Sequence, residues 1–214
     1  MITTFLFDFD GTIANTFPII FHAFQGIFRE YKQQYVSPAD IVKMFGPAED
    51  EIIQTHFKDH GNVHSIIERY YELYSTSHEN FVPSQTEINS LLKDIHNDGH
   101  SIGVITGKGR RSLDISVGQL FPDIAFDVTI AGDEVNNPKP HPEGILEALA
   151  QLCVQPEDAV YIGDSDIDIL AGKRANVKTI AVKWFESNGY HRLTLSPNVL
   201  LHHFHEFHQQ WRTL

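Results

Sequence analysis

The chain has 214 residues, 42% of them hydrophobic, and carries a formal net charge of −12 from 16 basic and 28 acidic side chains. This length suits one domain, or one core with a modest insertion. The acidic balance argues against a nucleic-acid partner, whose phosphates need a basic surface. No apolar run reaches the roughly 18 residues that would indicate a membrane span, so no membrane partner is expected.

The first predicted element is a buried strand over residues 2–7, which is apolar and runs directly into Asp8-Phe9-Asp10-Gly11-Thr12. Positions 8 and 10 leave a strand on the same side, so two carboxylates are crowded together. Such crowding is unfavourable unless a cation lies between them or one holds a proton. Mg²⁺ prefers these oxygen ligands, and a carboxylate beside it can attack phosphorus. Gly11 permits a sharp turn whose amide groups face an anion.

A helical stretch follows. Apolar residues recur at helical spacing over 18–32, and shorter helices are predicted over 37–44, 49–60 and 63–77. Thr16 is a plausible N-cap of the first of them. Phe81 to Ser84 reads as a return linker. We therefore expect an all-helical cap over residues 15–81, inserted into a core formed by residues 1–14 and 82–214.

Strands and helices alternate after the linker. Helices are expected over 86–97, 109–119, 142–152 and 167–175, and strands over 101–105, 125–130, 159–162 and 177–182. This alternation predicts an α/β fold with a Rossmann-like parallel sheet and helices on both faces. Ligands of such sheets bind beyond the carboxyl ends of the strands. The tail reads as a weak helix over 187–193, a short strand near 199–201 and a last helix to Trp211.

Polar groups stand at two further strand ends. Thr106 and Gly107 follow one strand, where a hydroxyl and free amides can bind phosphate; an ordinary N-cap threonine is the alternative. Asp164 follows Gly163 and would complete an oxygen shell around Mg²⁺. Asp168 fits a metal ligand, an acceptor beside the metal, or a partner of Lys139.

Two lysines near these strand ends differ in their setting. Lys139 lies between Pro138 and Pro140, which stiffen the backbone and hold the ammonium in place near the carboxylates. Lys108 fits a phosphate contact or an exposed lysine equally well. The sequence therefore places one fixed cation at the predicted site.

The single cysteine, Cys153, excludes an internal disulfide. It lies in an apolar helical pattern, so we expect a buried thiol. With no signal peptide visible, the location expected is cytoplasmic. His205 and His208 are spaced to share a helix face and could bind a transition metal, but a solvated face is the preferred interpretation.

The ordered set of Asp8-x-Asp10-Gly11-Thr12, Thr106, Lys139 and Gly163-Asp164-Ser165 resembles the four motifs of the haloacid dehalogenase superfamily, from Thr3 to about Lys183. Helices inserted after the first motif are similar to the subgroup with a helical cap, which includes phosphoglycolate phosphatases, pyrophosphatases and β-phosphoglucomutases. Asn15 departs from many relatives, which carry an acid there.

The resemblance implies a Mg²⁺-dependent phosphatase that hydrolyses a small phosphorylated metabolite through an aspartyl-phosphate. By it, Asp8 is the nucleophile and Asp10 the general acid and base, while Thr106 and Lys139, with the Gly11 and Gly107 backbone, hold the phosphoryl group. Asp8, Asp164 and the backbone carbonyl of Asp10 would bind Mg²⁺, and Asp168 would support the metal or Lys139. A phosphomutase, a pyrophosphatase or, remotely, a non-catalytic binding protein are the alternatives, as a monomer or homodimer.

Overall fold

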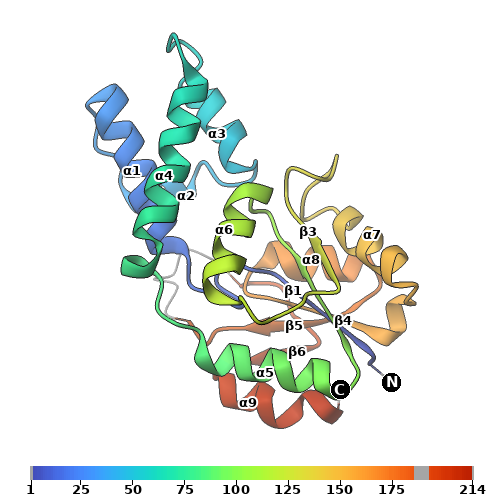
Figure 1. The fold of residues 1–214 in the computed structure, drawn as a ribbon. Helices are drawn as coiled ribbons and strands as arrows, with labels where there is room; N and C mark the ends of the chain where they lie inside the picture. Colours follow the sequence, from blue (N-terminus) through green and yellow to red (C-terminus); the bar gives the residue numbers. More distant parts are fainter. Residues whose placement is uncertain (1, 186–192, 214) are drawn as a thin grey trace.

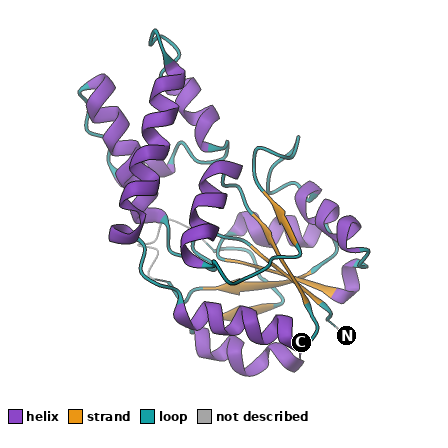
Figure 2. Ribbon diagram, in the orientation of Figure 1, coloured by secondary structure: helices purple, strands orange, loops and turns teal. Residues whose placement is uncertain are grey.

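A computed structural model describes residues 2–185 and 193–213. Its strands form a six-stranded parallel sheet in the order β3-β2-β1-β4-β5-β6 (Figures 1 and 2). The strands are β1 Thr4–Phe7, β2 Ser101–Ile105, β3 Val128–Ile130, β4 Ala159–Gly163, β5 Lys178–Val182 and β6 Val199–Leu201. β1 lies between β2 and β4, because the chain builds the sheet outward first on one side of β1 and then on the other.

Alternate residues of β1 face two separate cores, as strand geometry requires. Phe5 and Phe7 pack in one cluster with residues of α5 and α9, and Leu6 packs in another with residues of α7 and α8. Figure 1 shows α5 and α9 together on one side of the sheet. The core helices are α5 Thr86–Asn97, α6 Arg110–Leu120, α7 Glu143–Leu152, α8 Asp166–Arg174 and α9 Phe204–Gln210, with 3₁₀ turns at Pro156–Asp158 and Trp211–Thr213. The predicted Rossmann-like α/β fold is confirmed.

The stretch between β1 and α5 is helical and stands apart from the sheet in Figure 1. Its helices are α1 Phe17–Lys32, α2 Pro38–Val42, α3 Glu49–His56 and α4 Val63–Phe81. They share a hydrophobic cluster of their own, which runs from Phe17 to Val82. We keep the name cap for residues 15–81, whose division from the core as a domain stays a prediction.

The boundaries of several elements differ from those expected. The strand expected over 125–130 is shortened to Val128–Ile130, and the helix expected to end at Ser77 continues to Phe81. The weak helix predicted over 187–193 falls almost entirely on residues 186–192, outside the described part of the chain. Cys153 corrects a prediction: it follows α7 as a C-cap residue with φ 56° and is exposed, because the helix ends one residue before it.

Among the described residues, no helix is both long and apolar enough to cross a bilayer.

Candidate active site

Three predicted site residues each come directly after a central strand. Asp8 follows β1, Thr106 follows β2 and Asp164 follows β4. Phe7 of β1 is in register with Val104 and Ile162 of the two neighbouring strands. Because the strands are parallel, these side chains emerge at one edge of the sheet, where the strand order reverses and ligands of such folds bind.

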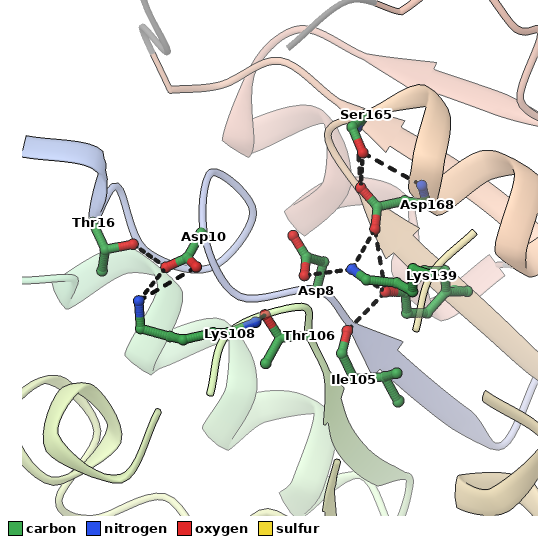
Figure 3. Close-up of polar contacts among 10 residues, drawn as sticks. Asp8, Asp10, Thr16, Ile105, Thr106, Lys108, Lys139, Ser165 and Asp168 are labelled. Carbon is green, nitrogen blue, oxygen red and sulfur yellow. Dashed lines mark hydrogen bonds and ion pairs between the residues drawn. The ribbon is translucent and has the colours of Figure 1, made fainter. Parts of the chain in front are cut away.

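Lys139 reaches this edge from the loop between β3 and α7. Its ammonium donates hydrogen bonds to Asp8 Oδ1 at 2.7 Å, to Asp168 Oδ1 at 2.6 Å and to the Tyr161 hydroxyl at 3.0 Å (Figure 3). The Tyr161 hydroxyl in turn donates to the carbonyl of Ile105 at 2.8 Å. The lysine is therefore held by Asp8 just after β1, by Tyr161 of β4 and by Asp168 of α8.

Asp168 accepts from both sides. Oδ1 accepts from Lys139, while Oδ2 accepts from the backbone amide of Ser165 at 3.1 Å and from the Ser165 hydroxyl, forming a capping box at the start of α8. A β-carbon on Gly163 would lie 2.3 Å from the β-carbon of Asp168, so only glycine fits there. The sequence left three roles open for Asp168. Its hydrogen bond to the Lys139 ammonium supports one of them, that of a partner to Lys139.

Three buried carboxylates lie close enough to share a cation. Each of Asp8, Asp164 and Asp168 offers one oxygen, and the three oxygens lie within 4.8 Å of one another. Burial raises the pKa of Asp8 to about 7; the Lys139 ammonium acts in the opposite sense, and the carboxylates of Asp168 and Asp164 raise it further. One ammonium does not balance three carboxylates, so the site favours an added positive charge.

Gly11 makes room for the third carboxylate. Its φ is +83°, and a β-carbon there would lie 2.4 Å from Asp164 Oδ2. The hard oxygen donors of this set fit Mg²⁺ in chemical type. The Asp10 carboxylate contacts Lys108 and Thr16 and is not part of the three-carboxylate cluster. Any contribution from this residue to a metal site would therefore come through its backbone carbonyl.

The Asp10 carboxylate faces Lys108. The Lys108 ammonium lies 3.2 Å from Asp10 Oδ1 and 3.4 Å from Oδ2, and the Thr16 hydroxyl also donates to Oδ1 (Figure 3). Thr16 precedes α1 but makes no side-chain cap to it. The hydroxyl predicted to cap a helix thus binds a predicted site residue.

Thr106 and Gly107 lie on the loop that joins Ile105 to Lys108 (Figure 3). Thr106 is buried, and its hydroxyl accepts from the backbone amide of Lys108 at 3.2 Å. The N-cap position of α6 belongs to Gly109, so Thr106 is not the cap residue that the sequence allowed. The threonine hydroxyl therefore stays at the end of β2 and does not cap α6.

Two further residues, Lys108 and Glu49, belong to the cluster of charged side chains around Asp10 and were not assigned to the site from the sequence. From the sequence, Lys108 fitted a phosphate contact and an exposed lysine equally well. In the structure its side chain is 0% exposed. Burial opposes its protonation, but the Asp10 and Glu49 carboxylates and Tyr74 outweigh burial and raise the pKa of Lys108 above its usual range. Glu49, predicted only to begin a helix, has its carboxylate 3.6 Å from the Lys108 ammonium. An acid in a first helical turn is common, so no local signal distinguished it.

The C-terminal histidines lie outside this cluster. His205 and His208 are exposed, and His208 Nε2 lies 3.5 Å from Asp94 Oδ2 on the surface. This matches the solvated face preferred from the sequence.

Comparison with known proteins agrees with the fold and the motifs. Residues 5–182 match the family described as haloacid dehalogenase-like hydrolase. The pyrophosphatase PpaX of Anoxybacillus flavithermus is 32% identical over 200 residues, which cover 94% of this chain and 92% of that protein. PpaX of Bacillus anthracis is 30% identical over 201 residues, with the same coverage.

Solved structures give the same result. CbbY from Rhodobacter sphaeroides, crystallised in complex with phosphate, is 26% identical with a TM-score of 0.81, covering 97% of this chain and 96% of CbbY. A haloacid dehalogenase-like hydrolase from Bacteroides fragilis is 25% identical with a TM-score of 0.77, covering 97% and 100%. These matches confirm the expected membership: the chain belongs to the haloacid dehalogenase-like hydrolase family.

Proposed function

We propose that this protein is a Mg²⁺-dependent phosphatase of small phosphorylated metabolites that works through an aspartyl-phosphate on Asp8. The observation that carries the proposal is the buried cluster in which Lys139 contacts both Asp8 and Asp168 while Asp164 lies beside them. In-line displacement at phosphorus depends mainly on positioning and on neutralising charge. A fixed ammonium among carboxylates at the carboxyl ends of the central strands meets both requirements.

The first step forms a bond between an Asp8 oxygen and phosphorus as the bond from phosphorus to the leaving oxygen breaks. Asp10 gives its proton to that leaving oxygen, which departs as an alcohol or as phosphate. Lys139, with the Thr106 hydroxyl and the backbone amides of Gly11 and Gly107, balances the negative phosphoryl oxygens. The result is a phosphorylated Asp8 and an ionised Asp10.

In the second step Asp10 takes a proton from water, and the water oxygen attacks the phosphorus of the aspartyl-phosphate. The bond to Asp8 breaks, inorganic phosphate leaves, and both carboxyl groups return to their starting states. Asp8, Asp164 and the backbone carbonyl of Asp10 would hold Mg²⁺. An ion held there would supply positive charge to offset that of the transferring group, while Asp168 keeps Lys139 in place.

Two substrate classes follow from different sources of support. The motif order favours a small phosphomonoester, with phosphoglycolate as its representative. The relatives named pyrophosphatase favour inorganic pyrophosphate as a second candidate. Both are small anions that release phosphate. The cap as a domain separate from the core, a monomeric or homodimeric state, and the cytoplasmic location stay predictions.

The test is phosphate release across a panel of phosphorylated metabolites and pyrophosphate, with Mg²⁺ and with chelator. The Asp8→Asn variant serves as the control because it replaces the proposed nucleophile with an amide of nearly the same shape. We expect release that chelator and the variant both abolish. Wild-type turnover in Asp8→Asn would overturn the proposal, and a product that is a rearranged sugar phosphate without free phosphate would indicate a phosphomutase instead.

A further inference from the structure

Glu49, in α3 of the cap, accepts hydrogen bonds from two residues at the start of the core helix α6. It is the first residue of α3 and is 6% exposed. Oε2 accepts from the backbone amide of Gly109 at 2.7 Å, and Oε1 accepts from the Ser112 hydroxyl at 2.6 Å. A residue of the inserted cap therefore binds the N-terminal turn of the core helix α6.

The same carboxylate contacts Lys108. The Lys108 ammonium lies between Glu49 Oε1 at 3.6 Å and Asp10 Oδ1 at 3.2 Å. It also lies 4.9 Å from the ring centroid of Tyr74, which belongs to α4 of the cap. An ammonium without solvent needs such partners, because its burial is costly otherwise. Two of the three partners named here come from the cap, so the position of Lys108 depends on where the cap lies.

Asp10 thus receives two contacts that depend on the cap. Thr16, at the entrance to α1, donates to it directly. Glu49 acts indirectly, because its carboxylate holds the Lys108 ammonium against Asp10. With the cap displaced, Lys108 would lose the Glu49 carboxylate on its other side and would no longer be held in one position against Asp10.

We propose that Glu49 is a positioning residue that couples closure of the cap to the placement of Asp10, acting through Lys108. The inference rests on the proposed function, in which Asp10 protonates the leaving group. A closed cap then orients Asp10 as the acid, and an open cap leaves the nucleophile Asp8 in place with Asp10 poorly oriented. Lid closure that completes a catalytic set is a general device of enzymes that handle reactive intermediates.

The test compares two esters that differ in their need for an acid. Departure of p-nitrophenolate needs little protonation, whereas ethanol leaves from ethyl phosphate only when its oxygen is protonated. We expect Glu49→Gln to lower kcat/KM about 10-fold or more for ethyl phosphate and less than about threefold for p-nitrophenyl phosphate, within the usual size of acid catalysis. The ratio of the two values, measured on one preparation, does not depend on the fraction of folded enzyme.

Glu68→Gln is the matched control. Glu68 of α4 joins the cap to Arg111 of α6 in an ion pair at 2.6 Å, but both side chains are about half exposed, at 47% and 46%. Such a pair contributes little, and within residues 2–185 and 193–213 no hydrogen bond or ion pair joins it to Asp10. We expect both kcat/KM values of Glu68→Gln to stay within about twofold of wild type.

A double variant tests the route through Lys108. If Glu49 acts through this lysine, Lys108→Met and the pair Lys108→Met with Glu49→Gln should show the same ratio of kcat/KM values, since coupled residues are not additive. An unchanged ratio in Glu49→Gln, or additive effects in the double variant, would overturn the inference. Wild-type enzyme with no phosphatase activity, or full activity in Asp8→Asn, would instead overturn the proposed function.

Discussion

The ammonium of Lys139 lies 2.7 Å from a carboxylate oxygen of Asp8, although 131 residues separate the two along the chain. The same ammonium contacts Asp168, which α8 presents through its capping box. Burial lowers the pKa of Lys139, but the carboxylates of Asp168 and Asp8 outweigh burial and raise it well above its usual value. Lys139 is therefore a permanent positive charge at the strand edge.

Lys139→Met should lower phosphate release by about 10²- to 10³-fold, because it removes a preorganised charge from the transferring phosphoryl group. Steady-state turnover with saturating Mg²⁺ measures the change. Lys93→Met is the control, since Lys93 pairs with Asp123 at 3.4 Å on the surface and should leave turnover unchanged. Equal turnover in the two variants would contradict a role for Lys139 in the reaction.

Gly11→Ala should impair Mg²⁺ binding and activity together. The added β-carbon would lie 2.4 Å from Asp164 Oδ2, and φ of +83° is unfavourable for alanine. Gly118→Ala is the matched control: Gly118 lies exposed within α6, with open space around it. That change should stabilise the fold by about 0.5–1 kcal/mol and leave activity intact. Calorimetry of Mg²⁺ binding and thermal unfolding distinguish the two variants. Normal Mg²⁺ affinity in Gly11→Ala would contradict the proposal that Gly11 makes room for the Asp164 carboxylate at the metal site.

Mg²⁺ should stabilise the folded protein by mass action. At about 100 times its Kd the gain is about 2.7 kcal/mol, which raises Tm by about 5–10 °C for a chain of this size. Asp164→Asn should abolish most of this shift, because it removes one of the three clustered carboxylates. Asp123→Asn, on the surface, should retain it. Thermal unfolding with Mg²⁺ and with chelator is the measurement, and an undiminished shift in Asp164→Asn would place the ion elsewhere.

Stability should fall as pH drops below about 6.5, in part because of His78. Burial, aided by the Lys108 ammonium, lowers the pKa of His78 to about 4. Between about 6.5 and 4 the unfolded chain binds a proton that the folded protein excludes, so the free energy of unfolding decreases as pH falls. From pH 7.5 to 5 the histidine contributes a loss of about 2 kcal/mol.

His78→Gln removes this contribution, so its loss of stability over the same range should be about 2 kcal/mol smaller. Urea denaturation at the two pH values, with chelator present, measures it. His96→Gln, at an exposed position, should behave as the wild type does. Parallel losses in wild type and His78→Gln would show that the imidazole takes up its proton in the folded state.

Local patterns were enough to predict most of the fold. The apolar run before Asp8 predicted the buried strand that is found at Thr4–Phe7, and the helix over Thr86–Asn97 and the strand over Ser101–Ile105 begin and end where their periodicity does. Alternation of the two element types then required a parallel sheet, because such strands must be joined by crossovers. The errors lie mainly at element ends, as at β3, which begins at Val128 rather than at residue 125.

The sequence by itself determined which chemical groups stand at the strand ends, since Asp8, Thr106 and Asp164 follow directly from the strand boundaries. It also marked Lys139 as a fixed cation, because prolines constrain the loop on either side. Only the tertiary structure decided which groups meet. Lys108 and Glu49 lie 59 residues apart on different substructures, and nothing near either one predicts an ion pair. Their contact, like the direction of Thr16 toward Asp10, exists because the helices inserted after β1 fold back over the sheet edge, and a local pattern carries no information about that approach.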